Sequence, residues 1–254
     1  MQWIDKQRMR DQVLTGTFVN LASPTAVEIV AGVGFDWMVL DHEHGSDTLS
    51  GLRACLHACR GSQTAPIVRL PSLDADGVKF VMDSGAAGVM FPFVQNAEQA
   101  AAAVACLKYP PEGTRGVASA IRATDYSRNW KSYFETANTR STVIVQIETP
   151  EAVENADAIA QVDGVDVLFV GPLDLSVNLG HPAEFDHPVV LQALQHVVDV
   201  CQRHGRTAGI LTKSGLESVH LQQGFRFVAA GSDINAVLDG MRANLNSLRA
   251  VSAG

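Results

Sequence analysis

Hydrophobic residues occur along this chain in short, nearly uninterrupted runs that alternate with longer segments of mixed character. The runs are rich in β-branched and aromatic residues, as expected of parallel strands that are buried on both faces. They predict eight strands: Thr15–Leu21, Asp36–Leu40, Pro66–Leu70, Gly88–Phe91, Thr142–Ile147, Val165–Val170, Thr207–Leu211 and Phe225–Ala229.

The segments between these runs repeat their apolar positions with a helical period. They predict helices over Pro24–Val33, Leu49–Arg60, Asp74–Ser84, Ala97–Leu107, Pro150–Gln161, Pro188–His204, Lys213–Gln222 and Asp233–Ala250. A strand followed by a helix, eight times, predicts an α/β fold of the (β/α)8 TIM-barrel type, formed by a single domain over residues 1–254. An open doubly wound sheet is the alternative, and the lack of a Rossmann glycine fingerprint after the first strand counts against it.

One connection is much longer than the others. Tyr109 to Ser141 separates the fourth predicted helix from the fifth strand, and its Pro110, Pro111 and Gly113 predict a loop. Residues Tyr126–Asn138 within it have a helical pattern. An insertion of this length in a compact domain is usually functional or serves assembly.

Composition narrows the class of protein. The chain has 254 residues, of which 46% are hydrophobic and 18% charged, which excludes a disordered chain, a coiled coil or collagen. Its net charge of −8 counts against a nucleic-acid partner. No uncharged run reaches transmembrane length, so no membrane partner is expected. The four cysteines and the charged N-terminus, which lacks a secretory hydrophobic core, favour the cytoplasm.

The cysteines themselves suggest little chemistry. Cys55, His57 and Cys59 lie close together, but Cys55 and Cys59 also fall at helical spacing with Leu52 and Leu56. A buried cysteine often serves as a small hydrophobic residue. A core role is therefore favoured over a metal site, for which a second pair of ligands is missing.

Polar residues follow several of the predicted strands. In a TIM barrel the active site lies at the carboxyl ends of the strands, which meet at one rim. Singly, each residue could form a surface salt bridge, a helix cap or a turn, but their joint position predicts a site. The rim residues are Asp41, His42, Glu43, His44, Arg69, Gln146, Glu148, Asp174 and Lys213.

These residue types favour enolate chemistry assisted by a metal. Glu148 and Asp174 offer only oxygen ligands, which suit Mg²⁺ or Mn²⁺, with Zn²⁺ as second choice. Such a cation can chelate a 2-oxo acid and act as a Lewis acid. Arg69 can donate hydrogen bonds to the oxygen on which charge develops. His44 is the natural general base, and Asp41 or Asp83 could orient it.

Six sequence pieces together resemble one family. They are Leu40-Asp41-x-Glu43-His44, Val68-Arg69, Asp83-x-Gly85-Ala86, Pro110-Pro111-x-Gly113-x-Arg115-Gly116, Gln146-Ile147-Glu148-Thr149 and Val170-Gly171-Pro172-x-Asp174-Leu175-Ser176. In this order they resemble the HpcH/HpaI family of class II, metal-dependent pyruvate aldolases, within the phosphoenolpyruvate/pyruvate-binding barrel superfamily. The resemblance covers essentially the whole chain.

The resemblance implies a role for each catalytic residue. Glu148 and Asp174 match the protein ligands of a divalent cation, Mg²⁺ or Mn²⁺, with Co²⁺ as a further option. His44 matches the base, Arg69 the residue that stabilises the enolate, and Asp83 the carboxylate that pairs with the histidine. The implied reaction is reversible cleavage of a 4-hydroxy-2-oxo acid to pyruvate and an aldehyde.

It also implies how the substrate binds. Gln146 matches a polar residue beside the pyruvate oxygens. Backbone amides around Gly171–Asp174 would hold the pyruvate carboxylate, which makes Gly171, Pro172 and Leu173 substrate-binding residues. Leu211 would form an apolar wall near the aldehyde.

The family assembles as trimers or hexamers that exchange their last helix, so a homo-oligomer is expected. Residues Asp233–Leu248 are a candidate for that exchange, with packing on their own barrel as the alternative. Their apolar stripe consists of Val237, Leu238, Met241, Leu245 and Leu248.

Two residues depart from the family pattern. His42 stands where a small or polar residue is usual, and could contact substrate or act as an alternative base. Lys213 follows the seventh strand and raises a rival Schiff-base mechanism, which requires burial to lower its pKa. An acyl-CoA lyase, for which Arg115 and Lys108 could supply the CoA contacts, and a non-catalytic 2-oxo-acid-binding protein are further alternatives.

Overall fold

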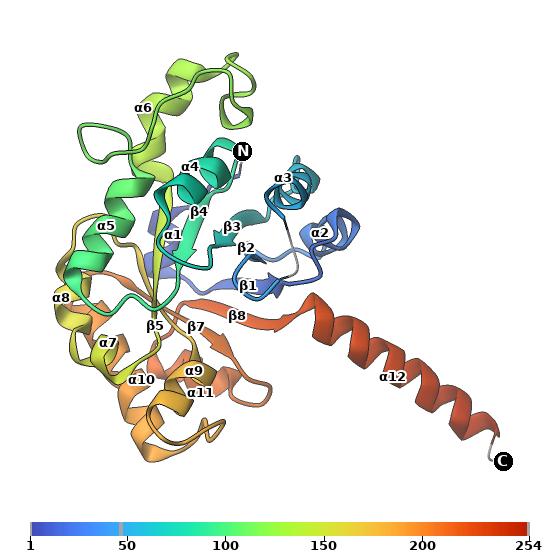
Figure 1. The fold of residues 1–254 in the computed structure, drawn as a ribbon. Helices are drawn as coiled ribbons and strands as arrows, with labels where there is room; N and C mark the ends of the chain where they lie inside the picture. Colours follow the sequence, from blue (N-terminus) through green and yellow to red (C-terminus); the bar gives the residue numbers. More distant parts are fainter. Residues whose placement is uncertain (1, 46–47, 253–254) are drawn as a thin grey trace.

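A closed barrel of parallel strands forms the centre of the molecule. The computed structural model describes residues 2–45 and 48–252. Each strand pairs with the next in sequence, and β1 pairs with β8 to close the barrel (Figure 1). The predicted α/β class and (β/α)8 barrel are therefore confirmed. The strands are β1 (Leu14–Val19), β2 (Trp37–Asp41), β3 (Ala65–Arg69), β4 (Gly88–Phe91), β5 (Thr142–Ile147), β6 (Val167–Val170), β7 (Thr207–Thr212) and β8 (Phe227–Ser232).

Side chains alternate between the two sides of the barrel wall, because successive residues of a strand point to opposite faces. Val39 and Ile67 belong to the cluster that fills the barrel. Their neighbours Leu40 and Val68 belong to the cluster between the barrel and its helices. Every second residue of a strand therefore faces the barrel axis, and the last of these reaches the mouth of the barrel.

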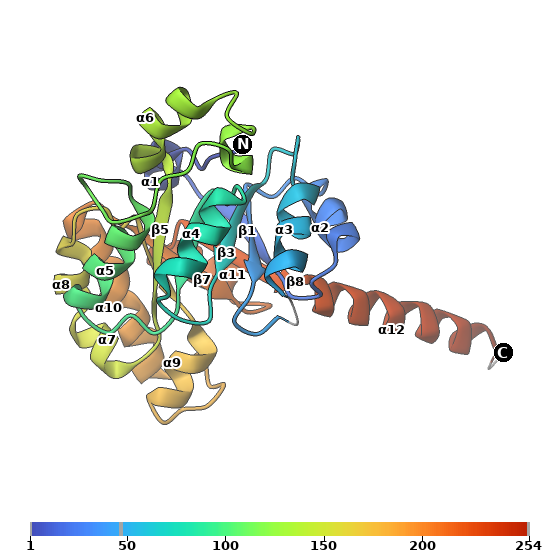
Figure 2. The ribbon, with the colours of Figure 1, turned by 45° about the horizontal axis from the view of Figure 1, so that its top comes forward.

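Helices connect the strands on the outside of the barrel, as Figure 2 shows. Several begin at capping residues, since the side chains of Ser23, Asp74 and Asn96 accept amide protons of the first turn. The helices are α1 (Lys6–Asp11), α2 (Pro24–Ala31), α3 (Leu49–Ala58), α4 (Ala75–Asp83), α5 (Ala97–Leu107), the 3-10 helix η1 (Arg122–Thr124), α6 (Trp130–Arg140), α7 (Pro150–Glu154), α8 (Ala156–Gln161), α9 (Pro172–Asn178), α10 (Pro188–His204), α11 (Glu217–Gln223) and α12 (Asp233–Ser252).

Several of the predicted helices differ from the observed ones. The helix predicted over Pro150–Gln161 is divided at Asn155, whose side-chain amide donates to the backbone of Gln95. The short helix α9 was not predicted, although Pro172 in its first turn is a typical start signal. Helix α11 begins at Glu217 and not at Lys213, because the backbone of Gly215 has a φ of 88°.

The insertion before β5 also starts its helix late. Asp125, Tyr126 and Ser127 have positive φ angles, so the helix predicted from Tyr126 begins only at Trp130. Helix α6 stands at the edge of the barrel beside the N-terminal segment (Figure 2). Trp3 of that segment stacks on Tyr133 of α6 with ring centroids 6.0 Å apart, which attaches the insertion to the body of the molecule.

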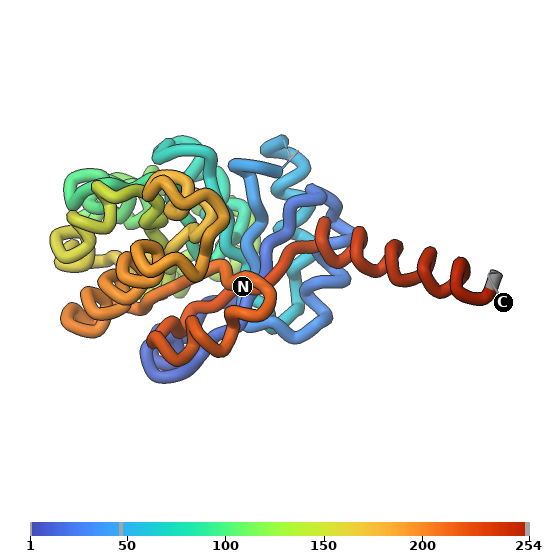
Figure 3. Tube along the Cα trace, turned by 90° about the horizontal axis from the view of Figure 1, so that it is seen from below, coloured from blue at the N-terminus to red at the C-terminus, as the bar shows by residue number. Residues whose placement is uncertain are grey.

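The last helix leaves the barrel. Helix α12 projects from the end of β8 as a straight rod in two views at right angles (Figures 1 and 3). Val237, Leu238, Met241 and Leu245 are 44–66% exposed along it. The alternative prediction, that this stripe packs on its own barrel, is therefore wrong.

The remaining sequence predictions concern cysteines and membranes. Cys55, Cys59, Cys106 and Cys201 are buried thiols, and burial raises the pKa of Cys59 to about 12. Cys55 and Cys59 are core residues, as predicted, and Cys106 and Cys201 are buried as well. Over the residues that the structure describes, none of the helices is long and apolar enough to span a membrane.

Candidate active site

The strand alternation brings polar side chains to the mouth of the barrel. Asp41 and Arg69 occupy inward positions two residues beyond Val39 and Ile67. Gln146 and Glu148 continue the inward series of β5 in the same way. All four are at least nine-tenths buried, so their charges and polar atoms must be satisfied by one another or by a ligand.

Arg69 is held by two carboxylates. Its Nε and Nη2 donate to the two oxygens of Asp41 at 2.8 and 2.7 Å, and its Nη1 lies 2.9 Å from Glu43 Oε2. Burial acts to raise the pKa of Asp41, but the bonds and charge of Arg69 outweigh it and hold that pKa below its usual range. The guanidinium also lies 5.2 Å from the centre of the Phe18 ring. Arg69 is therefore oriented in advance, with N–H groups left over for a ligand.

Among the carboxylates at the mouth of the barrel, Glu148 has the pKa that is raised furthest from its ordinary value. Its Oε1 accepts from Gln146 Nε2 at 2.7 Å, and its Oε2 accepts from the Phe93 amide at 3.2 Å. Burial and the nearby charge of Asp174 raise the pKa of Glu148 to about 8. A buried carboxylate beside a second carboxylate is stabilised by a cation, so the pair Glu148 and Asp174 fits a divalent metal ion.

The segment after β6 presses against this carboxylate. Asp174 lies in the first turn of α9, and its charge also acts to raise the pKa of Glu43. A Cβ added to Gly171 would lie 2.4 Å from Glu148 Oε1. Pro172 is buried and Leu173 is 47% exposed. The glycine therefore lets the backbone approach the Glu148 carboxylate closely.

The two histidines of the rim differ in their contacts. His44 is 68% exposed, and its Nε2 lies 3.8 Å from Glu43 Oε2. An exposed imidazole at the mouth can exchange protons with both substrate and water. His42 is half-buried, and its Nδ1 has no hydrogen-bond partner among the residues that the structure describes.

The structure does not bring Asp83 to His44 within one chain. Asp83 Oδ1 accepts from Arg115 Nη2 at 2.6 Å, near the end of α4. Over the residues that the structure describes, it makes no hydrogen bond or ion pair with His44. Arg115 is buried by this contact and by the hydroxyl of Tyr133, while Lys108 pairs with Glu112 at 3.2 Å. Arg115 and Lys108 are thus already engaged, which weakens the acyl-CoA alternative.

Strand β7 supplies the other side of the mouth. Leu211 packs against the cluster inside the barrel, as an apolar wall requires. Lys213 is the first residue after the strand. It is two positions beyond Leu211, so it continues the series of residues that face the barrel axis. Its Nζ lies 5.3 Å from the centre of the Phe185 ring. Burial lowers the pKa of Lys213, against the nearby charge of Asp174.

The sequence did not show the role of three residues that contact the site. Glu43 was part of the family motif, and the structure makes it a second partner of Arg69. Asn20, directly after β1, donates to Asp41. Asn178 of α9 donates to the backbone of Glu148 at 2.9 Å. Asn20 could have been found by looking for polar residues at the carboxyl end of the first strand, as for the other strands.

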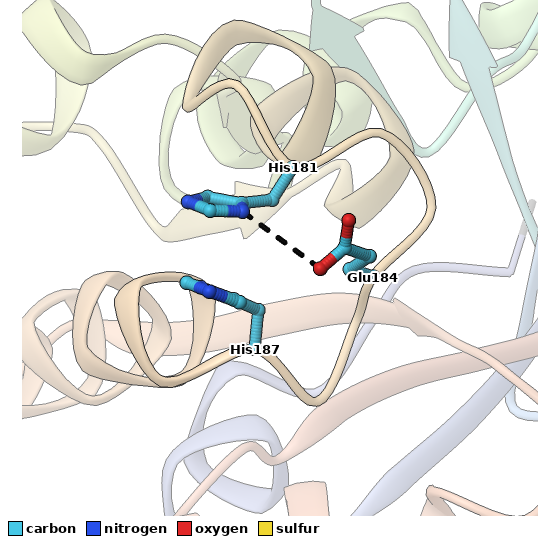
Figure 4. A group of neighbouring side chains, drawn as sticks. All are labelled: His181, Glu184 and His187. Atoms are coloured by element: carbon cyan, nitrogen blue, oxygen red, sulfur yellow. Dashed lines mark ion pairs between the residues drawn. The ribbon is translucent and has the colours of Figure 1, made fainter.

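A second group of ionisable side chains lies outside this site, on the loop between α9 and α10 (Figure 4). The rings of His181 and His187 stack at 3.4 Å, and His181 Nδ1 lies 3.8 Å from Glu184 Oε2. His187 Nδ1 accepts the amide proton of Val189 at 3.3 Å, which ties the ring to the first turn of α10. The ligand atoms of His181, Glu184 and His187 lie within 4.8 Å of one another, so the three residues could hold a metal ion, separately from the site at the mouth of the barrel.

The closed barrel, with acidic groups and one restrained arginine at the carboxyl ends of its strands, defines an enzyme of the TIM-barrel class. The HpcH/HpaI aldolase/citrate lyase family model matches residues 14–240. The chain therefore belongs to this family. The expected class of enzyme, a carbon–carbon lyase of the aldolase type, is confirmed.

Individual relatives agree with this. A 5-keto-4-deoxy-D-glucarate aldolase of Enterobacter sp. (strain 638) is 41% identical over 224 residues, which cover 88% of this chain and 87% of the relative. That of Salmonella paratyphi A is 43% identical over 226 residues, covering 89% and 88%. The crystal structure of an HpcH/HpaI aldolase/citrate lyase family protein from Burkholderia cenocepacia J2315 superposes with a TM-score of 0.91 at 34% identity, covering 96% and 98% of the two chains.

Proposed function

We propose that this enzyme catalyses reversible aldol cleavage of a 4-hydroxy-2-oxo acid to pyruvate and an aldehyde, with a divalent metal ion, Mg²⁺ or Mn²⁺. The observation that carries the proposal is the meeting of Glu148, Asp174 and the restrained Arg69 at one mouth. The relatives named 5-keto-4-deoxy-D-glucarate aldolases support the substrate class.

The metal would be held by Glu148 and Asp174, whose oxygens suit a hard cation with exchangeable waters. The cation supplies a Lewis acid for the carboxylate and keto oxygens of the 2-oxo acid. Burial and the adjacent Asp174 make Glu148 costly to ionise alone, so the bound cation and the deprotonated carboxylate stabilise one another.

The remaining steps use the side chains of the chain. In cleavage, His44 accepts the proton of the 4-hydroxyl group, the C3–C4 bond breaks, and its electron pair moves to the C2 oxygen as the aldehyde leaves. Arg69 donates to that oxygen, where negative charge grows in the transition state. Asp41 and Glu43 keep the guanidinium in place, and a proton returned to C3 completes pyruvate.

The substrate contacts follow from the same geometry. Gln146, held against Glu148 at 2.7 Å, would contact the pyruvate oxygens. Gly171, Pro172 and Leu173 would form the backbone wall beside the pyruvate carboxylate. Leu211 would contact the aldehyde. Asp83 pairs with Arg115 within one chain, and its expected pairing with His44 stays a prediction.

We propose that the enzyme is a homo-oligomer, a trimer or a hexamer, in which α12 packs on a neighbouring chain. The exposed stripe of Val237, Leu238, Met241 and Leu245 supports this. Apolar surface of this extent along a helix is buried in most proteins.

The test is deuterium exchange into the methyl group of pyruvate, followed by NMR with EDTA and then with Mg²⁺, Mn²⁺ or Co²⁺. Exchange that the metals restore is the expected result. Glu148→Gln or Asp174→Asn should slow exchange by more than about 100-fold, beyond the loss typical of residues outside the metal's own ligands. Glu151→Gln, which changes an exposed glutamate of α7, is the matched control.

Three outcomes would contradict the proposal. Exchange that survives EDTA would indicate a Schiff base on Lys213. Absent exchange with every metal would favour an acyl-CoA lyase or a binding protein. A Glu148→Gln enzyme as active as the Glu151→Gln control would remove the metal from Glu148.

A further inference from the structure

Lys213 is the charged residue of the mouth that the proposed reaction leaves without a task. It is the first residue after β7 and lies two positions beyond Leu211, on the side of the strand that faces the barrel axis. The side chain is half-buried. Its position places the ammonium group on the same side of the mouth as the proposed aldehyde wall.

This ammonium has no anionic partner. Over the described residues 2–45 and 48–252, Lys213 makes no hydrogen bond or ion pair through Nζ, which lies 5.3 Å from the centre of the Phe185 ring. Arg69, by comparison, is bound by both Asp41 and Glu43. The half-buried ammonium can therefore bind an anionic ligand without first breaking an ion pair.

The acidic groups of the mouth do not fill this need. Asp174 is near enough for its charge to act on Lys213, but it forms no ion pair with it, and in the proposed function its oxygens bind the metal. Glu148, Glu43 and Asp41 are bound to Gln146 and Arg69. The ammonium is therefore available to an anionic group of the substrate.

We propose that Lys213 determines specificity by binding a carboxylate at the far end of the aldehyde. This rests on the proposed function, in which the pyruvate half is fixed between Arg69 and the metal ligands. The aldehyde half must then extend along Leu211 toward Lys213. Half-burial of the ammonium over an aromatic ring reduces the screening of a bound carboxylate by water. Lys213 is accordingly the residue that would distinguish a 4-hydroxy-2-oxo diacid from a monoacid.

The experiment compares acceptors in the aldol direction. Pyruvate and the metal-loaded enzyme are given glyoxylate or succinic semialdehyde, which carry a carboxylate, or glycolaldehyde and propanal, which do not. In Lys213→Gln the ratio of kcat/KM for charged over neutral acceptors should fall about 10- to 100-fold, the range of a hydrogen bond to a charged group. The loss should appear mainly in KM, and Lys213→Arg should restore part of it.

Lys131→Gln is the matched control, since Lys131 lies on the exposed face of α6 and should leave the ratio unchanged. An unchanged ratio in Lys213→Gln would overturn the proposal. So would a Lys213-dependent preference for glyceraldehyde 3-phosphate over the carboxylated aldehydes, an equal loss with both kinds of acceptor, or trapping of pyruvate on Lys213 by borohydride. If the wild-type enzyme fails to exchange the pyruvate methyl protons, the proposed function fails instead, so the two failures are distinguishable.

Discussion

At the scale of single residues, the site depends on how closely backbone and carboxylate can approach one another. Gly171 has a φ of −89°, which any residue can adopt. Its lack of a side chain is required only by the contact with Glu148. The glycine is therefore explained by the space that the Glu148 carboxylate occupies, and not by the backbone.

Gly171→Ala should weaken metal binding without unfolding the barrel. The new Cβ would lie 2.4 Å from Glu148 Oε1, so the carboxylate must move. We expect the dissociation constant for Mn²⁺, measured by electron paramagnetic resonance, to rise about 10- to 100-fold. Gly240→Ala is the control, because a Cβ there meets no atom within 4 Å. Equal Mn²⁺ affinity in both variants would show that Glu148 tolerates the displacement.

At the scale of elements, the sequence predicted the strands well because burial on both faces leaves a continuous apolar run. β4 and β5 begin and end where predicted, as do α5 and α10. Position at a strand end sufficed to identify Asp41, Arg69, Gln146 and Glu148 as neighbours. It could not show that Asp83 pairs with Arg115, because that contact joins a helix end to the irregular insertion. Backbone turns with positive φ, as at Asp125, likewise have no hydrophobic period.

Helix α12 is the element whose apolar stripe is not covered by its own chain. Leu245→Asp should break the proposed assembly, because it would place an unpaired charge in an apolar interface. We expect its association constant, from sedimentation velocity, to fall by at least about 100-fold per interface. Ala243→Asp introduces the same charge on the opposite side of the helix and should remain assembled. Identical sedimentation of the two variants would place the interface elsewhere.

At the scale of the whole molecule, the buried Glu148 links stability to pH. Its pKa is about 8 in the folded chain, raised by burial and by Asp174, and returns to its ordinary value on unfolding. Between these values the unfolded chain binds fewer protons at this site, so without metal its contribution to stability falls as pH rises. The loss of this contribution to stability is complete above about pH 8, where Glu148 is ionised in the folded chain as well.

The free energy of unfolding in urea with EDTA should show this. Glu148→Gln should gain stability relative to wild type between pH 5 and 8, by at most about 1.4 kcal/mol per pH unit, and saturating Mn²⁺ should reverse the difference. The wild-type comparison is required because burial lowers the pKa of His220, which acts in the opposite direction. A difference independent of pH would mean that Glu148 is ionised in the metal-free protein. Glu151→Gln should follow wild type throughout.

The helix that projects from β8 has a further consequence for the whole molecule. If α12 reaches its native surroundings only on another copy, part of the chain's stability is set by mass action. Dilution would then act as a denaturant, and the melting temperature would rise with protein concentration. The abundance of the enzyme in its host would thus help to determine how much of it is folded and able to turn over substrate.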